Sequence, residues 1–424
     1  MKMNGPFEGL KVVEMGTFVA APSCARFFAD FGAEVVKVES KAGDLIRFNG
    51  VSEGRLGSPY ENTTFDLENA HKKDLVVNLK APEGREVLFK LLSETDIFIT
   101  SWRPQALAKL GLGYENLKDQ FPRLIYASFT GYGETGPDCD LPGYDFTAFW
   151  ARGGLMGSLM QKGEAPMNLA AGIGDHTSGY ILAAGILTAL YNREKTGKGD
   201  YVTTSLFQVS AYLQGMTMQC AQYKDLGQSY PISRKTAENP FNNAYKTKDG
   251  RWIQLSMPPF DIFYPRFMPL IGREDLVGNP RYTMDNITEN HLHEEFINII
   301  DEAFEKKTTA EWLEILKKAD IPHSLCQTWE EVLEDEQAWA IGVFEEFDYP
   351  ISGKRTMLRL PIHLKNNPKP PMERAPYLGE HSEEILKGMG YTDEQMKEMH
   401  EKGIYNTWDD LRERCGGQKP DLLP

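Results

Sequence analysis

The chain has 424 residues, of which 41% are hydrophobic and 25% charged, so it is long enough to fold into more than one domain. Its formal net charge of -15 argues against nucleic-acid binding, because no basic stripe offsets the repulsion from phosphates. Five scattered cysteines, an N-terminus without a signal-peptide pattern and the lack of a long apolar run predict a soluble, cytoplasmic protein without a membrane partner.

Apolar strands and helices alternate through the first half of the chain. The strand-like runs are Leu10–Glu14, Glu34–Glu39, Asp74–Leu79, Asp96–Thr100, Leu124–Phe129 and Tyr201–Leu206. Helical spacing is found in Pro22–Phe31, Pro82–Ser93, Ala106–Leu110, His176–Lys195 and Phe207–Tyr223. This alternation predicts an α/β fold with a doubly wound parallel sheet, forming a large domain over residues 1–223.

The pattern changes near Lys224. A hairpin is predicted at Ala244–Met257 around Asp249-Gly250, followed by helices Phe260–Ile271, Leu292–Phe304 and Thr309–Lys318. These elements predict a smaller α+β domain at residues 224–326. The remaining residues 327–424 contain an acidic helix, Trp329–Ala340, and a hairpin across Gly353, and we expect them to pack back on the large domain.

The turn after the first strand, Met15–Pro22, is placed like the start of a dinucleotide-binding domain. The three-glycine fingerprint is missing, since Gly16 is the one glycine present and bulky Phe18 follows it. The turn therefore argues against nicotinamide or flavin binding. Its helix N-terminal amides can still face another phosphate.

Asp175 lies in a glycine-rich segment, Ala170–Gly179, at the start of a long apolar helix. One interpretation is a simple N-cap, because aspartate is a preferred cap. The other is a covalent nucleophile, which the helix terminus keeps ionised near neutral pH. We expect a packing or hydrogen-bonding role for His176. His291 and His293 fit no standard metal site, so we predict none.

Six motifs, in order and nearly from end to end, resemble the family III CoA-transferases. They are GLKVVEMGTFVAAP with GAEVVKVES (9–40), KKDLVVNLKAPEGREVLFKLL (72–92), GYGETGPDCDLPGYDFTAFWARGG (131–154), GDHTSG (174–179), TGKGDYVTTSLF (196–207) and APYLGEHSEEILKGMGY (375–391). The resemblance implies that Asp175 is the nucleophile, through aspartyl anhydride and aspartyl-CoA thioester intermediates. It also implies an interlocked homodimer without a permanently bound cofactor, in which coenzyme A arrives as part of the acyl-CoA substrate.

By position, the resemblance implies a set of CoA contacts. They are Phe18, Val19, Ala20, Val77, Lys80, Ser101, Trp102, Lys109, Thr130 and Leu206. Lys80 and Lys109 would offer cations to the CoA phosphates, and Trp102 would stack on adenine.

Within the family, the chain is similar to members that activate 2-hydroxy acids in amino-acid fermentation, on ENTTFDLENAHKK (61–73), DLPGYDFTAFWARGG (140–154), MPPFDIFYPRF (257–267) and LEDEQAWA (333–340). This similarity implies CoA transfer from an enoyl-CoA, such as cinnamoyl-CoA, to an (R)-2-hydroxy acid, such as an aryl-lactate. A 2-hydroxyacyl-CoA dehydratase would then act on the product. The acid pocket is expected to include Tyr132, Tyr144, Phe146, Phe149, Trp150 and Met156.

Two alternatives to the transferase remain. The superfamily contains α-methylacyl-CoA racemases, but their catalytic histidine corresponds to Tyr144, and tyrosine is a poor base at neutral pH. The third reading is a non-catalytic acyl-CoA binding protein in which Asp175 is only a cap.

Overall fold

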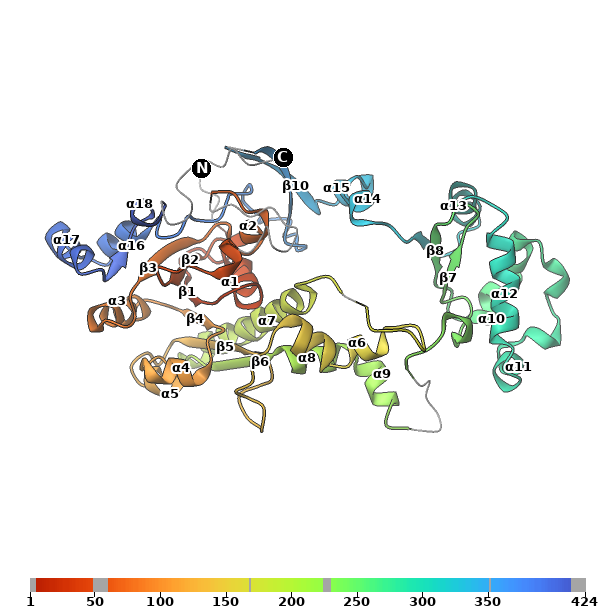
Figure 1. The fold of residues 1–424 in the computed structure, drawn as a ribbon, viewed down its shortest axis with the longest axis horizontal. Coiled ribbons are helices and arrows are strands. Elements are labelled where there is room, and N and C mark those ends of the chain that lie inside the picture. The colour runs from red at the N-terminus through yellow and green to blue at the C-terminus, as the bar shows by residue number, and fades with distance from the viewer. Residues whose placement is uncertain (1–4, 49–59, 168, 224–229, 351, 413–424) are drawn as a thin grey trace. The chain divides into compact units, whose positions relative to one another are not determined.

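The computed structural model describes residues 5–48, 60–167, 169–223, 230–350 and 352–412, and the chain divides into two compact units (Figure 1). The first unit comprises Met1–Leu155, Leu169–Gln214 and Glu336–Pro424, and the second Met156–Asn168 and Gly215–Asp335. The division differs from the expected limits at residues 223 and 326, because the second unit starts earlier, ends later and includes the segment after Leu155.

A seven-stranded sheet forms the centre of the first unit, in the order β12-β3-β2-β1-β4-β5-β6. The strands are β1 (Lys11–Met15), β2 (Glu34–Glu39), β3 (Lys73–Val77), β4 (Ile97–Thr100), β5 (Ile125–Thr130), β6 (Tyr201–Ser205) and β12 (Tyr405–Asn406). Six are parallel, and β12 runs antiparallel to β3. The strand order reverses between β1 and β4, where open α/β sheets bind ligands outside the carboxyl ends of their strands.

Helices cover both faces of this sheet, which explains why its central strands are apolar on both sides. On one face, side chains of the strands share a core with α3 (Pro82–Leu92), α4 (Pro104–Lys109), α5 (Tyr114–Leu117), α16 (Ser382–Gly388) and α17 (Asp393–Glu401). On the other face, α1 (Ala20–Asp30) packs on β1, β2 and β4, and α7 (Ile173–Thr196) packs on β5 and β6. The mixed α/β fold with a large parallel sheet is therefore confirmed.

The two helices α1 and α7 pack against each other at Gly179. A Cβ atom at this glycine would lie 2.5 Å from the backbone oxygen of Ala20 and 2.2 Å from Oγ of Ser23. Glycine is needed here because no side chain fits between the helices. The close approach brings the start of α1 beside the first turns of α7.

The other elements of the first unit surround this framework. They are α2 (Thr63–Asn69), the π-helical segment Asp145–Ala151, α8 (Leu206–Leu213), α15 (Glu336–Ala340), the hairpin β10 (Phe344–Tyr349) and β11 (Gly353–Leu358), and α18 (Trp408–Leu411). The single helix predicted at Phe207–Tyr223 is wrong, since α8 ends at Leu213 and α9 (Gly215–Cys220) follows. A glycine at this junction disfavours a continuous helix. Between the π-helical segment and α7, α6 (Leu155–Ser158) spans the unit boundary.

The second unit is a small α+β structure. Its antiparallel sheet joins β7 (Ala244–Lys246), β8 (Trp252–Leu255) and β9 (His323–Leu325). Its helices are α9, α10 (Phe260–Phe267), α11 (Met284–Glu289), α12 (His293–Phe304), α13 (Thr309–Lys318) and α14 (Trp329–Leu333). The predicted hairpin around Asp249-Gly250 is confirmed, with Gly250 at φ 84°. Buried aromatic rings, among them Phe241 and Phe296, fill the core.

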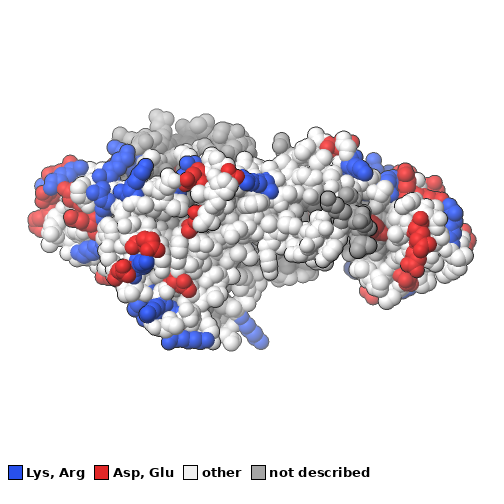
Figure 2. Space-filling model, turned by 90° about the horizontal axis from the view of Figure 1, so that it is seen from below, with Lys and Arg blue, Asp and Glu red and all other residues white. Residues whose placement is uncertain are grey.

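Charged side chains of both signs are interspersed on the face shown in Figure 2, and the described residues on this face form no continuous basic surface. In the part of the chain that the structure describes, none of the helices combines the length and the apolar character that a membrane span requires.

Candidate active site

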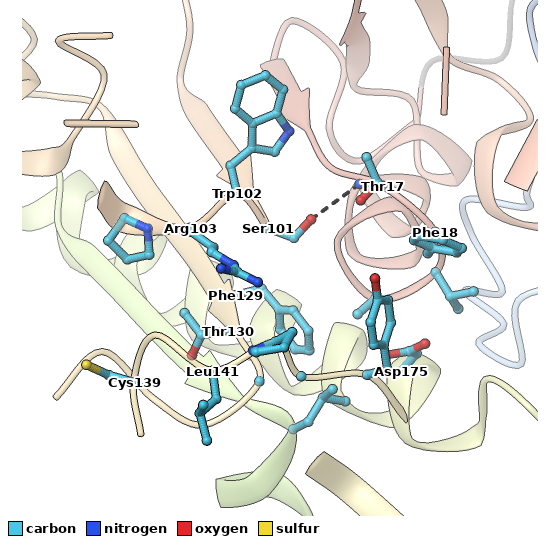
Figure 3. Close-up of a pocket in the computed structure, with 18 residues that line it drawn as sticks. Thr17, Phe18, Ser101, Trp102, Arg103, Phe129, Thr130, Cys139, Leu141 and Asp175 are labelled. Atoms are coloured by element: carbon cyan, nitrogen blue, oxygen red, sulfur yellow. Dashed lines mark hydrogen bonds between the residues drawn. The ribbon is translucent and has the colours of Figure 1, made fainter. Parts of the chain in front are cut away.

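A cavity of about 300 Å³ opens at the carboxyl ends of β1, β4, β5 and β6, all within the first unit (Figure 3). Its lining residues come from the turns that follow these strands, from the segment before the π-helical turn and from α7. They are Thr17, Phe18, Val19, Ala20, Ser101, Trp102, Arg103, Pro104, Phe129, Thr130, Gly131, Cys139, Leu141, Pro142, Gly143, Tyr144, Asp175 and Leu206. The cavity thus lies where the strand order of the sheet reverses.

Asp175 borders this cavity from the first turn of α7. The helix begins at Ile173 and its N-cap is Gly172, at φ 87° in the left-handed region, so Asp175 is the third helical residue. The interpretation of Asp175 as a simple N-cap is therefore wrong. No described residue donates a hydrogen bond to its partly buried carboxylate.

A second carboxylate, Asp145, occupies the start of α7 instead. Its Oδ2 accepts the backbone N–H of Gly172 at 2.8 Å. A Cβ atom at Gly174 would lie 2.3 Å from Asp145 Oδ1 and 2.3 Å from the ring of Phe149, so this helical turn is packed tightly against both side chains. Burial raises the pKa of Asp145, and the N–H groups of Gly172 and Gly174 oppose that rise.

Burial and the nearby Asp145 carboxylate change the pKa of Asp175. Burial, followed by the charge of Asp145, raises the pKa of Asp175 to about 7, although His176 lowers it. The expectation that the helix terminus keeps Asp175 ionised near neutral pH is therefore not met, because burial and a like charge outweigh the helix dipole.

His176 contacts Glu68 and does not form a pair with Asp175. Its Nε2 lies 2.7 Å from Oε1 of Glu68, which is almost fully buried. Burial lowers the pKa of His176, but Glu68 outweighs that effect and raises it to about 9. The predicted hydrogen-bonding role is confirmed, and the imidazolium supplies a positive charge next to Asp175 in sequence.

The cavity brings together many of the residues predicted for CoA and the acid. Phe18, Val19, Ala20, Ser101, Trp102, Thr130, Tyr144, Asp175 and Leu206 all line it. Tyr132, Phe146, Phe149, Trp150 and Met156 do not line it, and Phe149 and Trp150 are buried. Val77 is buried within β3, while Lys80 and Lys109 are exposed outside the cavity.

Sequence reasoning missed Arg103 and Cys139. The side chain of Arg103 extends between Ser101 and Thr130 in Figure 3. The sequence did offer a signal for Arg103, because it follows β4, one of the two strands between which the strand order of the sheet reverses. Cys139 belongs to a long loop, and nothing in its sequence surroundings distinguishes it. Among the described residues, no three His, Cys, Asp or Glu side chains gather as a metal site would require.

Comparison with known proteins gives one consistent family. The model of CoA-transferase family III matches residues 7–382. The chain is 49% identical to a cinnamoyl-CoA:phenyllactate CoA-transferase of Clostridium sporogenes, over 93% of this chain and 95% of the relative. It is 42% identical to an (R)-2-hydroxy-4-methylpentanoate CoA-transferase of Clostridioides difficile, over 94% and 98%.

Solved structures agree with these sequence relatives. A CAIB/BAIF family protein from Brucella suis superimposes with a TM-score of 0.76 at 28% identity, covering 91% of this chain and 100% of that one. The Rv3272 protein of Mycobacterium tuberculosis gives a TM-score of 0.77 at 27% identity, over 90% and 99%.

Proposed function

The chain belongs to CoA-transferase family III and is a CoA-transferase, and on this premise we propose that Asp175 carries CoA covalently between two carboxylic acids. The observation that supports this role is a carboxylate in a cavity wall, in the first turn of a helix, to which no described residue donates a hydrogen bond. A non-catalytic binding protein no longer fits the family, and Asp175 does not cap its helix.

The proposed reaction has four balanced steps. The Asp175 carboxylate attacks the thioester carbonyl of the donor, the C–S bond breaks, and an aspartyl anhydride and CoA thiolate form. The thiolate attacks the aspartyl carbonyl, which gives an aspartyl-CoA thioester and releases the donor acid. The acceptor carboxylate then attacks this thioester and displaces the thiolate. Finally, the thiolate attacks the acceptor carbonyl, which yields the new acyl-CoA and frees Asp175.

The raised pKa of Asp175 suits this chemistry. A nucleophile whose pKa lies close to the working pH combines a substantial ionised fraction with good basicity. Burial that raises the pKa also removes water that would hydrolyse an anhydride or thioester. The family chemistry uses the CoA of the acyl-CoA substrate, and we assign no further group to the cavity.

For CoA itself, we propose that the turns after β1 and β4 form the binding surface. Ser101 ties the two turns together, because its Oγ accepts the N–H of Thr17 at 3.3 Å. Arg103 offers a cation and Trp102 an indole to the same cavity, which fits the phosphates and adenine of CoA. Val77, Lys80 and Lys109 stay predicted contacts for the more distant part of CoA.

We further propose an (R)-2-hydroxy acid as acceptor, an aryl-lactate in particular, and an enoyl-CoA such as cinnamoyl-CoA as donor. The names of the two 2-hydroxyacyl relatives support this choice. Aromatic rings of Phe18, Phe129 and Tyr144 line the cavity and would pack against an aryl group. Rates with phenyllactate, 2-hydroxyisocaproate, carnitine and oxalate test the proposal, and a clear preference for carnitine or oxalate would overturn it.

Mass spectrometry tests the covalent step directly. After incubation with acyl-CoA and digestion, we expect a CoA adduct on the peptide that spans residues 172–179. Asp175→Asn should lack both the adduct and transfer activity, while folding normally. Full transfer by that variant, or an adduct on another peptide of the active enzyme, would contradict the assignment.

Two partner proposals complete the function. An interlocked homodimer is supported by large apolar side chains on the surface, such as Tyr212 at 80% and Met216 at 90% exposure. Light scattering should give twice the 47.9 kDa chain mass, and a monomer would refute the dimer.

The 2-hydroxyacyl-CoA product suits a 2-hydroxyacyl-CoA dehydratase as the next enzyme.

A further inference from the structure

Phe18 holds an unusual backbone conformation in the cavity wall. Its φ is 61°, in the left-handed region that a bulky aromatic residue rarely adopts. Its ring meets Tyr144 edge to face, with centroids 5.9 Å apart and planes at 87°. The strain of such a residue persists only where its surroundings enforce it. The position of the Phe18 ring in the cavity wall therefore depends on the contacts that hold its backbone at positive φ.

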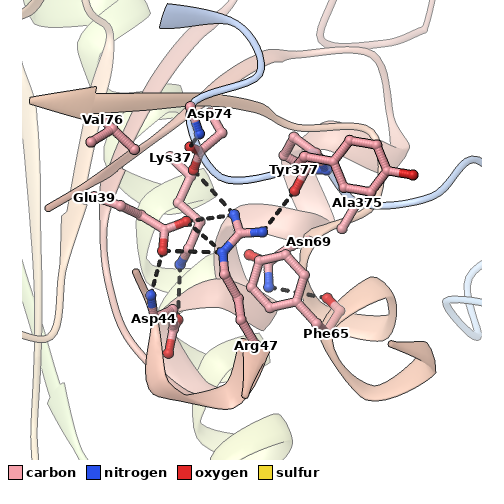
Figure 4. Close-up of polar contacts among 12 residues, drawn as sticks. Lys37, Glu39, Asp44, Arg47, Phe65, Asn69, Asp74, Val76, Ala375 and Tyr377 are labelled. Carbon is pink, nitrogen blue, oxygen red and sulfur yellow. Dashed lines mark hydrogen bonds and ion pairs between the residues drawn. The ribbon is translucent and has the colours of Figure 1, made fainter. Parts of the chain in front are cut away.

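The carboxylate of Asp44 is that constraint. Its Oδ1 accepts the backbone N–H of Phe18 at 3.1 Å, and its Oδ2 lies 3.2 Å from Nζ of Lys37. Lys37 also donates to the backbone oxygen of Gly16 at 3.0 Å and pairs with Glu14 at 2.8 Å. Lys37 and Asp44 thus hold the turn on both sides of Thr17, and both side chains are inaccessible to solvent (Figure 4).

The pair belongs to a larger buried ionic network. Its members are four acids and three bases: Glu14, Glu39, Asp44 and Asp74, with Lys37, Lys72 and Arg47. The pairs around Lys37 and those around Arg47 are joined where Oε2 of Glu39 accepts the backbone N–H of Asp44 at 2.5 Å. Figure 4 shows the guanidinium of Arg47 paired with both Glu39 and Asp74. Burial and the charge of Glu39 raise the pKa of Asp74 well above its ordinary value.

A buried network of this size is a poor source of stability, because desolvation offsets most of the attraction between the charges. Apolar side chains of similar volume would serve the fold at least as well. A role in fixing the geometry of the turn accounts for the charged groups of Lys37 and Asp44, which contact it.

We propose that Asp44 is a positioning residue of the transferase: supported by Lys37, it holds Phe18 in the left-handed conformation and so fixes the cavity wall against which the acyl group lies during transfer. This inference rests on the proposal that the reaction takes place in the Asp175 cavity. It assigns no contact between Asp44 and the substrate. Loss of Asp44 lets the turn relax and misplaces the ring of Phe18 relative to the nucleophile.

The test is a double-mutant cycle between Asp44 and Phe18. Asp44→Ala removes the acceptor, and we expect kcat/KM with phenyllactate to fall by about tenfold or more. Asp44→Asn keeps an oxygen acceptor and should retain most of the activity. Phe18→Gly lowers activity itself, since the ring is lost, but glycine adopts positive φ freely. Adding Asp44→Ala to Phe18→Gly should therefore have little further effect.

The matched control is Asp74→Asn, which alters a carboxylate of the same network whose partners are Arg47 and Gly379 and not the turn at Phe18. Asp74 is also buried and accepts a backbone N–H, from Gly379 at 2.5 Å, and we expect its variant to keep near-normal kcat/KM. Thermal unfolding and circular dichroism verify that each variant is folded. Phe18→Asn replaces Phe18→Gly if the latter is too slow to assay, because asparagine also tolerates positive φ.

The outcomes separate the two proposals. If Asp44→Ala is fully active, or lowers kcat/KM equally with and without the Phe18 substitution, the positioning role is refuted. If Asp175→Asn is active, the proposed site fails instead, whatever Asp44 does. An inactive Asp175→Asn variant together with a non-additive cycle supports both.

Discussion

Replacing Asp175 by asparagine should abolish transfer and at the same time stabilise the fold at pH 8. The pKa of the carboxyl is about 7 in the folded chain, against 3.8 as its ordinary value in an unfolded chain. Between these values the unfolded chain has lost the proton and the folded chain still holds it. Stability therefore decreases as the pH rises from about 4 to 7. Asparagine carries no charge and escapes this loss.

The magnitude follows from the same two values. The interval from 3.8 to about 7 corresponds to an upper limit of about 4 kcal/mol above pH 7. Because Asp175 is partly exposed to solvent, which screens its charge, we expect a gain of about 1–2 kcal/mol for Asp175→Asn at pH 8. The gain should shrink at pH 5, where the folded carboxyl is already protonated.

Urea unfolding at the two pH values measures this difference. Asp285→Asn is the matched control, since Asp285 is an exposed carboxylate in the first turn of α11. It should lose a few tenths of a kcal/mol at both pH values, because its interaction with the helix dipole disappears. Equal stability of Asp175→Asn and the wild type at pH 8, or a less stable variant, would refute the reasoning and indicate a structural role for Asp175.

Three further predictions concern activity and packing. In a pH–rate profile, wild-type kcat/KM should rise as the pH passes through about 7, where Asp175 loses its proton. His176→Gln should move this rise to a pH higher by about half to one unit, because the imidazolium lowers the pKa of Asp175. A rise at the same pH in the variant contradicts this. Gly179→Ala should destabilise the fold by about 1–3 kcal/mol in thermal unfolding, as its methyl group would overlap the oxygen of Ala20, and an unchanged midpoint would be inconsistent with that packing. Arg103→Met should raise KM for acyl-CoA about tenfold with little change in kcat, whereas an unaffected KM would remove Arg103 from the CoA surface.

Local patterns predicted the framework well where a segment carries its own signals. Glu34–Glu39 is predicted as a strand because of its run of valines, and β2 has these bounds. Gly197 ends α7 in the left-handed conformation, as expected of a glycine after a long helix. The helix at Thr309–Lys318 has a capping box between Thr308 and Glu311, and its bounds are also confirmed.

The detailed geometry of the site depends on contacts between segments that are distant in the sequence, so it was predicted less completely than the framework. The cap of α7 comes from Asp145, 27 positions before Gly172, so no local pattern pointed to it. The pKa of Asp175 follows from that same carboxylate and from burial. The support for Phe18 comes from Asp44 on another loop. Strand β12 is two residues long, too short for any periodicity to be seen.

That short strand has a consequence for biosynthesis. The outer edge of β3 is satisfied late in the chain, because the N–H of Val76 donates to Ser382 and β12 pairs with Val77 through Tyr405. While the ribosome is still translating, a nascent chain that already includes every cavity residue presents an open strand edge, the kind of surface that promotes aggregation. A chain that stops after Lys365 would lack both Ser382 and Tyr405 and would keep this edge of β3 unpaired, so we expect chaperones or proteases to bind it.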